Sequence, residues 1–280
     1  MEVVLLGTGC PSADPDRYGP ATLIDGGPGR RVLVDCGSGV TQRLVSANCP
    51  GRDIDALFLT HLHSDHTIDL FQLIISSWHQ GRDVPQRVYG PPGTKRYVDG
   101  LMKLWEPELK QRIAHELRPS TAALEVEVTE IEPGQSFDFA GMTVKVVPVE
   151  HQPIKHAYGF VFEDGESKIA ISGDTTYCPA LIEAAKDADI LVHEVFIHHE
   201  MKVIEGLRSR ETIENVAAYH TLSSVVGQVA TEANVKALAL THIVPPKCDE
   251  KSLYDEVAET FKGKILIGHD LMRIDPQKLT

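Results

Sequence analysis

Short runs of apolar residues recur along the chain, and their spacing separates strands from helices. Runs that alternate with polar residues or stay apolar for four to eight positions between turn residues are typical of strands. Longer stretches with apolar residues three or four positions apart are typical of helices. The pattern predicts helices near 68–80, 94–116, 178–186, 222–232 and 250–261. It predicts strands near 2–6, 21–25, 31–35, 54–59, 124–131, 136–139, 143–149, 158–163, 168–172, 189–193, 236–241 and 264–267.

The order of these elements indicates two sheets that are covered on the outside by helices, which is a layered α/β (α+β) architecture. The polar segment 198–219 lies between two of the elements and is too long for an ordinary connection. We expect it to form a partly helical loop over the functional site. With 280 residues, 42% of them hydrophobic, the chain can bury a large core, and we expect a single domain over 1–280.

The charge balance disfavours a nucleic-acid partner. Lys and Arg number 27 against 40 Asp and Glu, which gives a net charge of −13. Nucleic-acid-binding proteins usually present a basic surface or stripe, whereas the nearest basic run here, 202–210, is short and mixed. We therefore expect a small anionic substrate, with nucleic acid kept as the less favoured alternative.

Cysteine usage and the apolar pattern predict a cytoplasmic protein. The five cysteines are an odd number and contain no Cys-x-x-Cys pair, which is typical of reduced thiols. The chain opens directly on a strand pattern without the basic and apolar regions of a secretory signal. No stretch approaches the roughly 20 apolar residues that cross a bilayer. We expect no membrane association.

The segment Thr60-His61-Leu62-His63-Ser64-Asp65-His66 concentrates potential metal ligands. It follows an apolar run that reads as a buried strand, and a His-x-His pair at a strand end places both imidazoles on one side. The chain then turns, so that Asp65 and His66 can face the same pocket. Imidazoles together with a carboxylate suit Zn²⁺ or a similar divalent ion, and two ligands on each side of the turn indicate two ions.

Further candidate ligands follow other apolar strands. His151, Asp174 and His242 each come directly after such a run, and they raise the number of candidate ligands from four to seven. Two metal ions need about seven protein ligands and a bridging water. His269 also ends a strand and competes with His242 for the last position.

These motifs, with the opening Gly7-Thr8-Gly9, resemble the metallo-β-lactamase superfamily over almost the whole chain. The resemblance implies a four-layer αββα sandwich with a dinuclear site at one edge of the sheets. It implies that His61, His63 and His151 hold the first metal, that Asp65, His66 and His242 hold the second, and that Asp174 bridges the two. It also implies that Asp35 orients the ligands, a role that competes with capping a turn.

Within the superfamily the chain is similar to ribonuclease Z and its arylsulfatase-like and phosphodiesterase-like relatives. The resemblance rests on Leu6–Gly9 with Arg17, on 35–39, on Glu194, on His220 and on 240–243. In ribonuclease Z a Glu and a His at the positions of Glu194 and His220 assist proton transfer to the leaving group. Their structural alternatives are a buried ion-pair partner and a helix N-terminal residue.

Departures from ribonuclease Z favour a smaller substrate. That enzyme typically carries a basic arm that grips tRNA between the third histidine and the bridging aspartate, whereas here only 152–173 separate them. We expect a hydrolase with two Zn²⁺ (Mn²⁺ or Fe²⁺ as alternatives) in which metal-bound hydroxide attacks a phosphodiester or aryl sulfate. The alternatives are tRNA 3′-end cleavage and lactone or carboxylic-ester hydrolysis. The expected catalytic residues are Asp65, His220 and Glu194.

Four other histidines have no clear role in the sequence. His156 lies five residues after a candidate ligand, and His198 and His199 lie in the polar loop, so each is either a pocket residue or a solvated one. His269, if it is not a ligand, is a second candidate for the pocket wall. The resemblance also implies a homodimer.

Overall fold

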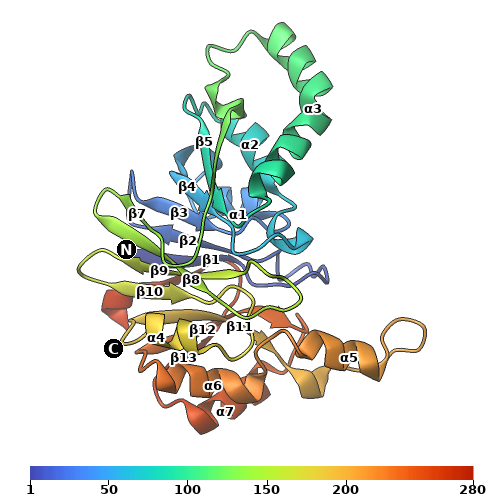
Figure 1. Cartoon of the computed structure of the whole chain (residues 1–280), viewed down its shortest axis with the longest axis vertical. Coiled ribbons are helices and arrows are strands. Elements are labelled where there is room, and N and C mark those ends of the chain that lie inside the picture. Colours follow the sequence, from blue (N-terminus) through green and yellow to red (C-terminus); the bar gives the residue numbers. More distant parts are fainter. Residues whose placement is uncertain (280) are drawn as a thin grey trace.

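Two seven-stranded sheets lie face to face in the computed structural model, which describes residues 1–279 (Figure 1). The first sheet has the order β14-β1-β2-β3-β4-β5-β6 and the second the order β13-β12-β11-β10-β9-β8-β7. The strands of the first sheet are β1 (Glu2–Gly7), β2 (Ala21–Asp25), β3 (Arg31–Val34), β4 (Ala56–Phe58), β5 (Gln86–Gly90), β6 (Val126–Glu130) and β14 (Met272–Ile274). Those of the second are β7 (Ser136–Phe139), β8 (Met142–Pro148), β9 (Tyr158–Glu163), β10 (Lys168–Ile171), β11 (Ile190–Phe196), β12 (Ala237–Val244) and β13 (Lys264–Ile267).

Each sheet combines antiparallel hairpins with a parallel half. In the first sheet β3, β4, β5 and β6 run parallel to one another, and in the second β10, β11, β12 and β13 do. The last strand, β14, returns to the first sheet and pairs antiparallel with β1. Because parallel strands end on the same side of a sheet, the segments that follow them gather along one edge of the sandwich.

The core between the sheets consists of the inward-facing residues of both. Its members include Val3 from β1, Phe58 from β4 and Phe160 from β9, all without solvent exposure. The rings of Phe58 and Phe160 meet edge to face at 5.3 Å, and Tyr89 stacks on Phe58 at 4.5 Å. The Phe58–Phe160 pair crosses between the two sheets and helps to bind them into one sandwich, whereas Tyr89 packs on Phe58 within the first sheet.

Helices cover the outer face of each sheet, which gives the four layers (Figure 1). The first sheet carries its helices on the side shown at the top of the view, and the second carries its own at the bottom, while α5 projects sideways with the loop before it. Asp249 caps α7 by accepting the N–H groups of Lys251 and Ser252. The helices are α1 (Val40–Ser46), α2 (Leu70–His79), α3 (Thr94–Glu116), α4 (Pro179–Ala184), α5 (Arg210–Ala217), α6 (Ser223–Glu232) and α7 (Glu250–Thr260).

The predicted layered sandwich is confirmed, and three elements are additional to the prediction. The helix α1 and the strands β5 and β14 were not expected from the pattern of apolar residues. The segment 198–219 contains α5, as the expectation of a partly helical loop required. Within residues 1–279, no helix combines the length and the apolar character that crossing a bilayer would demand.

Candidate metal centre

The loop after β4 brings its four candidate ligands to one edge of the sandwich. β4 ends at Phe58, and the chain then makes a single 3-10 turn over Ser64–His66. The N–H of His66 donates to the carbonyl of His63 at 3.2 Å, which folds the turn back on itself. As a result Asp65 and His66 face the region to which His61 and His63 point.

The first group of ligands consists of His61, His63, His151 and Asp174, whose ligand atoms lie within 4.8 Å of one another. The Nδ1 atom of His63 lies 2.9 Å from His61 Nε2 and 3.3 Å from His151 Nε2. Zn–N bonds of 2.0–2.1 Å in a tetrahedral site place neighbouring nitrogen atoms about 3.3 Å apart. The three imidazoles therefore have the spacing that one Zn²⁺ requires.

The second group consists of Asp65, His66 and His242. His242 Nε2 lies 3.4 Å from Asp65 Oδ2, and His66 Nε2 lies 3.5 Å from the same oxygen. His66 Nε2 is buried and has no hydrogen-bond partner among residues 1–279. An orphaned buried nitrogen that faces a carboxylate is the arrangement expected of a metal ligand without its ion.

His242 reaches this group through a β-bulge. β12 continues to Val244, and its pairing with β11 shifts so that Thr241 and Ile243 have partners while His242 has none. The backbone of His242 has φ 43°, which is uncommon for a residue other than glycine. Bulges redirect a side chain, and here the bulge turns the imidazole toward the ligand cluster.

A single oxygen of Asp174 lies at the middle of the two groups. Its Oδ2 atom is 3.4 Å from His66 Nε2, 3.5 Å from His242 Nε2 and 3.8 Å from His61 Nε2. It is also 3.8 Å from His151 Nε2, so it faces nitrogen atoms of both groups. Asp174 lies just after β10 and is almost completely buried. This central position is compatible with the bridging role predicted for Asp174.

Hydrogen bonds to the outer ring nitrogens fix three of the imidazoles. His66 Nδ1 lies 2.8 Å from Asp35 Oδ2, and His61 Nδ1 lies 3.0 Å from Thr60 Oγ1. Thr60 in turn donates its N–H to Asp35 Oδ1 at 2.8 Å. His151 Nδ1 lies 2.8 Å from the carbonyl of Tyr219. Such partners set the ring orientation and leave the inner nitrogens free for metal, and they assign Asp35 to orienting ligands.

The electrostatics of the cluster suit a cation. Burial lowers the pKa of His61, and the nearby His66 lowers it further. Burial also opposes the charge of His66, but Asp174 and Asp35 outweigh it and raise the pKa of that imidazole. Burial works against the Asp174 carboxylate as well, yet His242 and His66 hold its pKa below the ordinary value. A buried carboxylate kept ionised among imidazoles favours positive charge at this point.

Glu194 and His220 form a buried pair beside the cluster. Glu194 lies on β11, and its Oε1 accepts the N–H groups of Thr175 at 3.0 Å and of Thr221 at 3.2 Å. The same oxygen lies 2.9 Å from His220 Nδ1. Burial opposes the charge of His220, but the carboxylate of Glu194 compensates for it and raises the pKa to about 9. His220 also lies with Asp174 and His242 in a third cluster of ligand atoms.

A pocket of about 410 Å³ opens onto the cluster. Its wall includes Asp65, His220 and Tyr219, together with residues of the loop after β1. A second pocket of about 530 Å³ adjoins it, because both are lined by Cys10, Pro11, Ser64 and Asp65. The combined groove has room for a substrate larger than a single phosphate group.

The four histidines of uncertain role lie outside the cluster. His156 and His269 are exposed, which leaves His242 as the late ligand candidate. His198 lies 3.1 Å from Glu214 Oε1, and His199 is 3.9 Å from Glu256. None of the four lines the pocket at the metal cluster.

Sequence reasoning missed two groups that support the ligands. Thr60 belongs to the ligand motif itself, and its hydroxyl links Asp35 to His61. The carbonyl of Tyr219 orients His151 from 68 positions along the chain. A threonine directly before the first histidine was a visible signal, whereas a backbone carbonyl leaves no trace in a sequence.

The sandwich and its ligand cluster define a metal-dependent hydrolase of the metallo-β-lactamase fold. Among solved structures, the metallo-β-lactamase fold protein YhfI from Bacillus subtilis matches with a TM-score of 0.76 and 21% identity, covering 98% of this chain and 99% of the other. The short form of human tRNase Z matches with a TM-score of 0.73 and 21% identity, with the same coverage. At these identities the likeness concerns the fold.

Sequence relatives identify the family. The ribonuclease Z of Mycobacterium bovis (strain BCG / Pasteur 1173P2) is 35% identical over 280 residues, and the match covers 98% of each chain. A family model described as anti-Pycsar protein Apyc1 matches residues 1–220. The chain belongs to the ribonuclease Z subgroup of the metallo-β-lactamase superfamily and to the family that the Apyc1 model describes.

These relationships change the order of the expected substrates. They confirm a metal-dependent hydrolase that acts on ester bonds, including phosphodiester bonds. They favour the ribonuclease Z alternative over the small anionic ester that charge and the missing arm had placed first. Net charge is a sum over the whole chain and does not locate a binding surface. The similarity to ribonuclease Z rests on residues along the full length of the chain.

Proposed function

We propose that this protein is a metal-dependent phosphodiesterase of the ribonuclease Z type, which cleaves an RNA near its 3′ end. The observation that carries the proposal is the full-length similarity to proteins named ribonuclease Z, combined with a buried His220–Glu194 pair beside seven clustered ligands. A phosphodiester needs an oriented water, a neutralised phosphate and a proton for the leaving oxygen. Each of these tasks has a candidate among the described residues.

Two metal ions are assigned to the two groups of ligands. His61, His63 and His151 would hold one ion, Asp65, His66 and His242 would hold the other, and Asp174 would be shared between them. Nitrogen atoms 2.9–3.3 Å apart in the first group and an orphaned nitrogen on His66 support the assignment. Zn²⁺ is the ion that this donor set suits best, with Mn²⁺ or Fe²⁺ as alternatives. When bound, such ions neutralise phosphate charge and lower the pKa of water.

The chain's own residues supply orientation and the proton. Asp65 lines the pocket and orients the attacking water. Water adds to phosphorus and gives up a proton to the carboxylate of Asp65. The bond from phosphorus to the leaving oxygen breaks, and that oxygen takes a proton from the imidazolium of His220. The raised pKa of His220, about 9, keeps this proton in place at neutral pH, and Glu194 holds the ring.

A small phosphodiester is a second candidate substrate, and one feature of the fold favours it. The interval between His151 and Asp174 is a compact hairpin of β9 and β10 with a tight turn between Glu163 and Lys168, so no long arm projects from it. With a net charge of −13, the chain also offers little neutralisation for a long polyphosphate backbone. The groove of two adjoining pockets suits a ligand of nucleotide size.

The substrate test compares a precursor tRNA bearing a 3′ extension with bis(p-nitrophenyl) phosphate on the same metal-replete protein. Cleavage of the precursor at a defined 3′ position, lost in His220→Ala, supports the ribonuclease Z reading. Turnover of the nitrophenyl diester with an intact precursor supports the small-substrate candidate instead. Failure on both substrates would contradict the proposed phosphodiesterase activity.

We further infer that two copies associate through α3. This helix presents Leu104 with 72% and Trp105 with 40% of their surface exposed, while Trp105 stacks on Phe71 at 4.5 Å. A shallow groove beside it is lined by Leu62, Tyr97 and Leu101 among others. Large exposed apolar side chains that gather on one helix mark an interaction surface, and a second copy satisfies the dimer that the family resemblance implies.

A further inference from the structure

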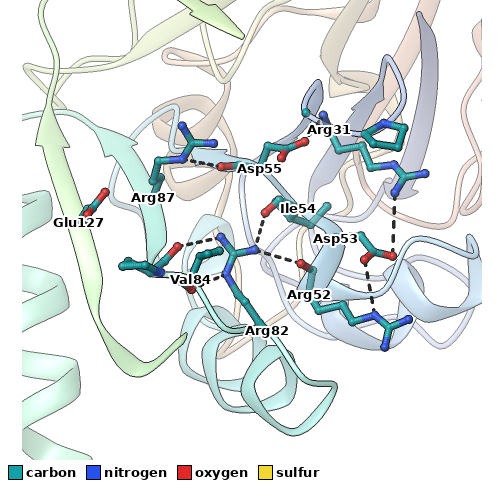
Figure 2. A pocket seen from close by; sticks show the side chains of 12 residues that line it. Arg31, Arg52, Asp53, Ile54, Asp55, Arg82, Val84, Arg87 and Glu127 are labelled. Atoms are coloured by element: carbon teal, nitrogen blue, oxygen red, sulfur yellow. Dashed lines mark hydrogen bonds and ion pairs between the residues drawn. The ribbon is translucent and has the colours of Figure 1, made fainter. Parts of the chain in front are cut away.

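A further pocket, of about 570 Å³, lies at the opposite end of the first sheet from the metal centre, and four arginines line it (Figure 2). Arg31 is the first residue of β3, Arg52 lies in the turn before β4, and Arg87 lies on β5. The pocket wall includes Ile54 and Asp55, which precede β4, whereas the metal ligands follow β4. The arginine pocket is therefore separate from the hydrolytic site.

Arg82 builds the floor of the arginine pocket. Its guanidinium donates to the carbonyls of Ile54 at 2.7 Å, Pro85 at 2.8 Å, Val84 at 3.0 Å and Arg52 at 3.1 Å. Figure 2 shows this side chain in the middle of the pocket with its bonds radiating to the surrounding backbone. Arg82 is 7% exposed. Its donors are used by the protein, so its role is to hold the wall in place.

The other three arginines retain donors that the protein does not use. Arg87 donates Nε–H to the carbonyl of Asp55 at 3.0 Å, and among residues 1–279 its two terminal nitrogens have no hydrogen-bond or ion-pair partner. Arg52 uses Nε on Asp53 and Nη1 on the carbonyl of Gln80, and its Nη2 has no partner within residues 1–279. Arg31 likewise keeps Nη2 after its contacts to two aspartates within the described chain.

Three carboxylates also line the wall, Asp53, Asp55 and Glu127, so the four arginines leave one positive charge in excess. Asp53 lies between Arg31 and Arg52, 3.9 Å from the first and 3.5 Å from the second. Glu127 is level with Arg87 on the neighbouring strand, but over residues 1–279 no ion pair joins them. Burial lowers the pKa of Arg82, and the neighbouring charge of Arg87 lowers it further. Like charges that are held close together in this way are relieved when an anion binds between them.

We propose that the arginine pocket binds the phosphate group of a small phosphorylated molecule. Guanidinium forks match phosphate oxygens two at a time, which favours phosphate over a monovalent anion. The volume lies within the roughly 300–1,000 Å³ of small-ligand pockets. Arg87 provides the fork with both terminal nitrogens free, and Arg31 and Arg52 provide one donor each from the opposite wall. The three arginines come from separate segments, so no basic run in the sequence marks them.

The test follows the arginine Nε–H resonances of isotope-labelled, metal-replete protein during titration with inorganic phosphate at constant ionic strength. We expect a saturable shift of the Arg87 signal, whereas sodium chloride gives none. In Arg87→Gln, the signals of Arg31 and Arg52 should report a dissociation constant at least tenfold higher. Arg96→Gln, which removes an exposed charge on α3, should leave the constant unchanged.

Two further variants keep the result decisive. Arg52 is more exposed than the others, so Arg52→Gln should fold normally and still weaken phosphate binding severalfold. Asp174→Ala disturbs the metal centre, and the Arg87 shift should persist in it because the two sites are separate. A shift that chloride reproduces, or a dissociation constant that neither arginine variant changes, would overturn the proposal.

Discussion

Replacing Asp35 with asparagine tests how the metal ligands are oriented. The carboxylate is 5% exposed, its Oδ1 accepts the Thr60 N–H at 2.8 Å, and its Oδ2 lies 2.8 Å from His66 Nδ1. Asparagine has the same shape but only one acceptor oxygen. If the amide NH₂ faces His66, the imidazole must carry its proton on Nε2, the nitrogen that faces the metal position. If the amide turns over, its NH₂ meets the N–H of Thr60 instead.

The first orientation removes the charge-assisted hydrogen bond of His66, and the second leaves His66 a weaker bond to a neutral oxygen and removes the bond to Thr60. Loss of such an orienting partner lowers metal affinity by about 10–100-fold, which corresponds to about 1.4–2.7 kcal/mol. We expect this loss at the ion held by Asp65, His66 and His242, and a smaller effect at the other ion through Thr60 and His61.

The assay is a competition for Zn²⁺ between the protein and a chromogenic chelator, analysed for two binding steps. Asp138→Asn is the matched control, because Asp138 is exposed and lies on β7 away from the ligands. Two binding constants in Asp35→Asn that stay within twofold of the unsubstituted protein would refute the orienting role.

Three other predictions concern catalysis, acid stability and assembly. His220→Ala should lower kcat by about 10²–10⁴-fold on whichever substrate the protein cleaves, with both metals retained. Glu194→Gln should cause a smaller loss of kcat. An unchanged kcat in both variants would remove this pair from the mechanism. Burial would raise the pKa of Asp164, but the N–H groups of Glu166 and Ser167 outweigh this effect and lower the pKa. The ionised carboxylate therefore stabilises the fold at pH values above its unfolded-state pKa. This stability is lost as the pH falls through the native pKa. Asp164→Asn should therefore cost about 1 kcal/mol in urea unfolding at neutral pH and almost nothing in acid, and an equal cost at both would contradict this. Leu104→Glu should convert a dimer into a monomer in light scattering, and a dimer that survives the change would place the interface elsewhere.

Much of the fold follows from local pattern, because a strand or helix that is buried on one face must repeat its apolar residues with the matching period. The long helix α3 was predicted with its observed bounds, 94–116, from apolar positions at helical spacing. The strand β5 was missed, because Gln86-Arg87-Val88-Tyr89-Gly90 has few apolar residues and becomes a strand through its parallel neighbours β4 and β6. Such pairing depends on segments that are distant in sequence.

In the candidate site too, residues that are close in sequence could be grouped in advance, whereas those brought together by distant segments could not. His61, His63, Asp65 and His66 could be grouped from sequence because one short turn holds them together. His242 was expected after the end of a strand, whereas it lies inside β12 at a bulge created by the register with β11. The arginine pocket could not be predicted, since Arg31, Arg52 and Arg87 meet only when three separate segments pack together.

If the clustered ligands support hydrolysis of a phosphodiester, a comparison of three reporter substrates should show it. Hydrolysis rates should be measured for the zinc-loaded protein on nitrophenyl reporters that carry a phosphodiester, a sulfate or a carboxylic ester, with Asp174→Ala as the blank. We expect a clear preference for the phosphodiester and loss of that activity in the variant, because Asp174 Oδ2 faces four candidate ligand histidines. Preference for the sulfate or carboxylic ester, or full activity in Asp174→Ala, would contradict it.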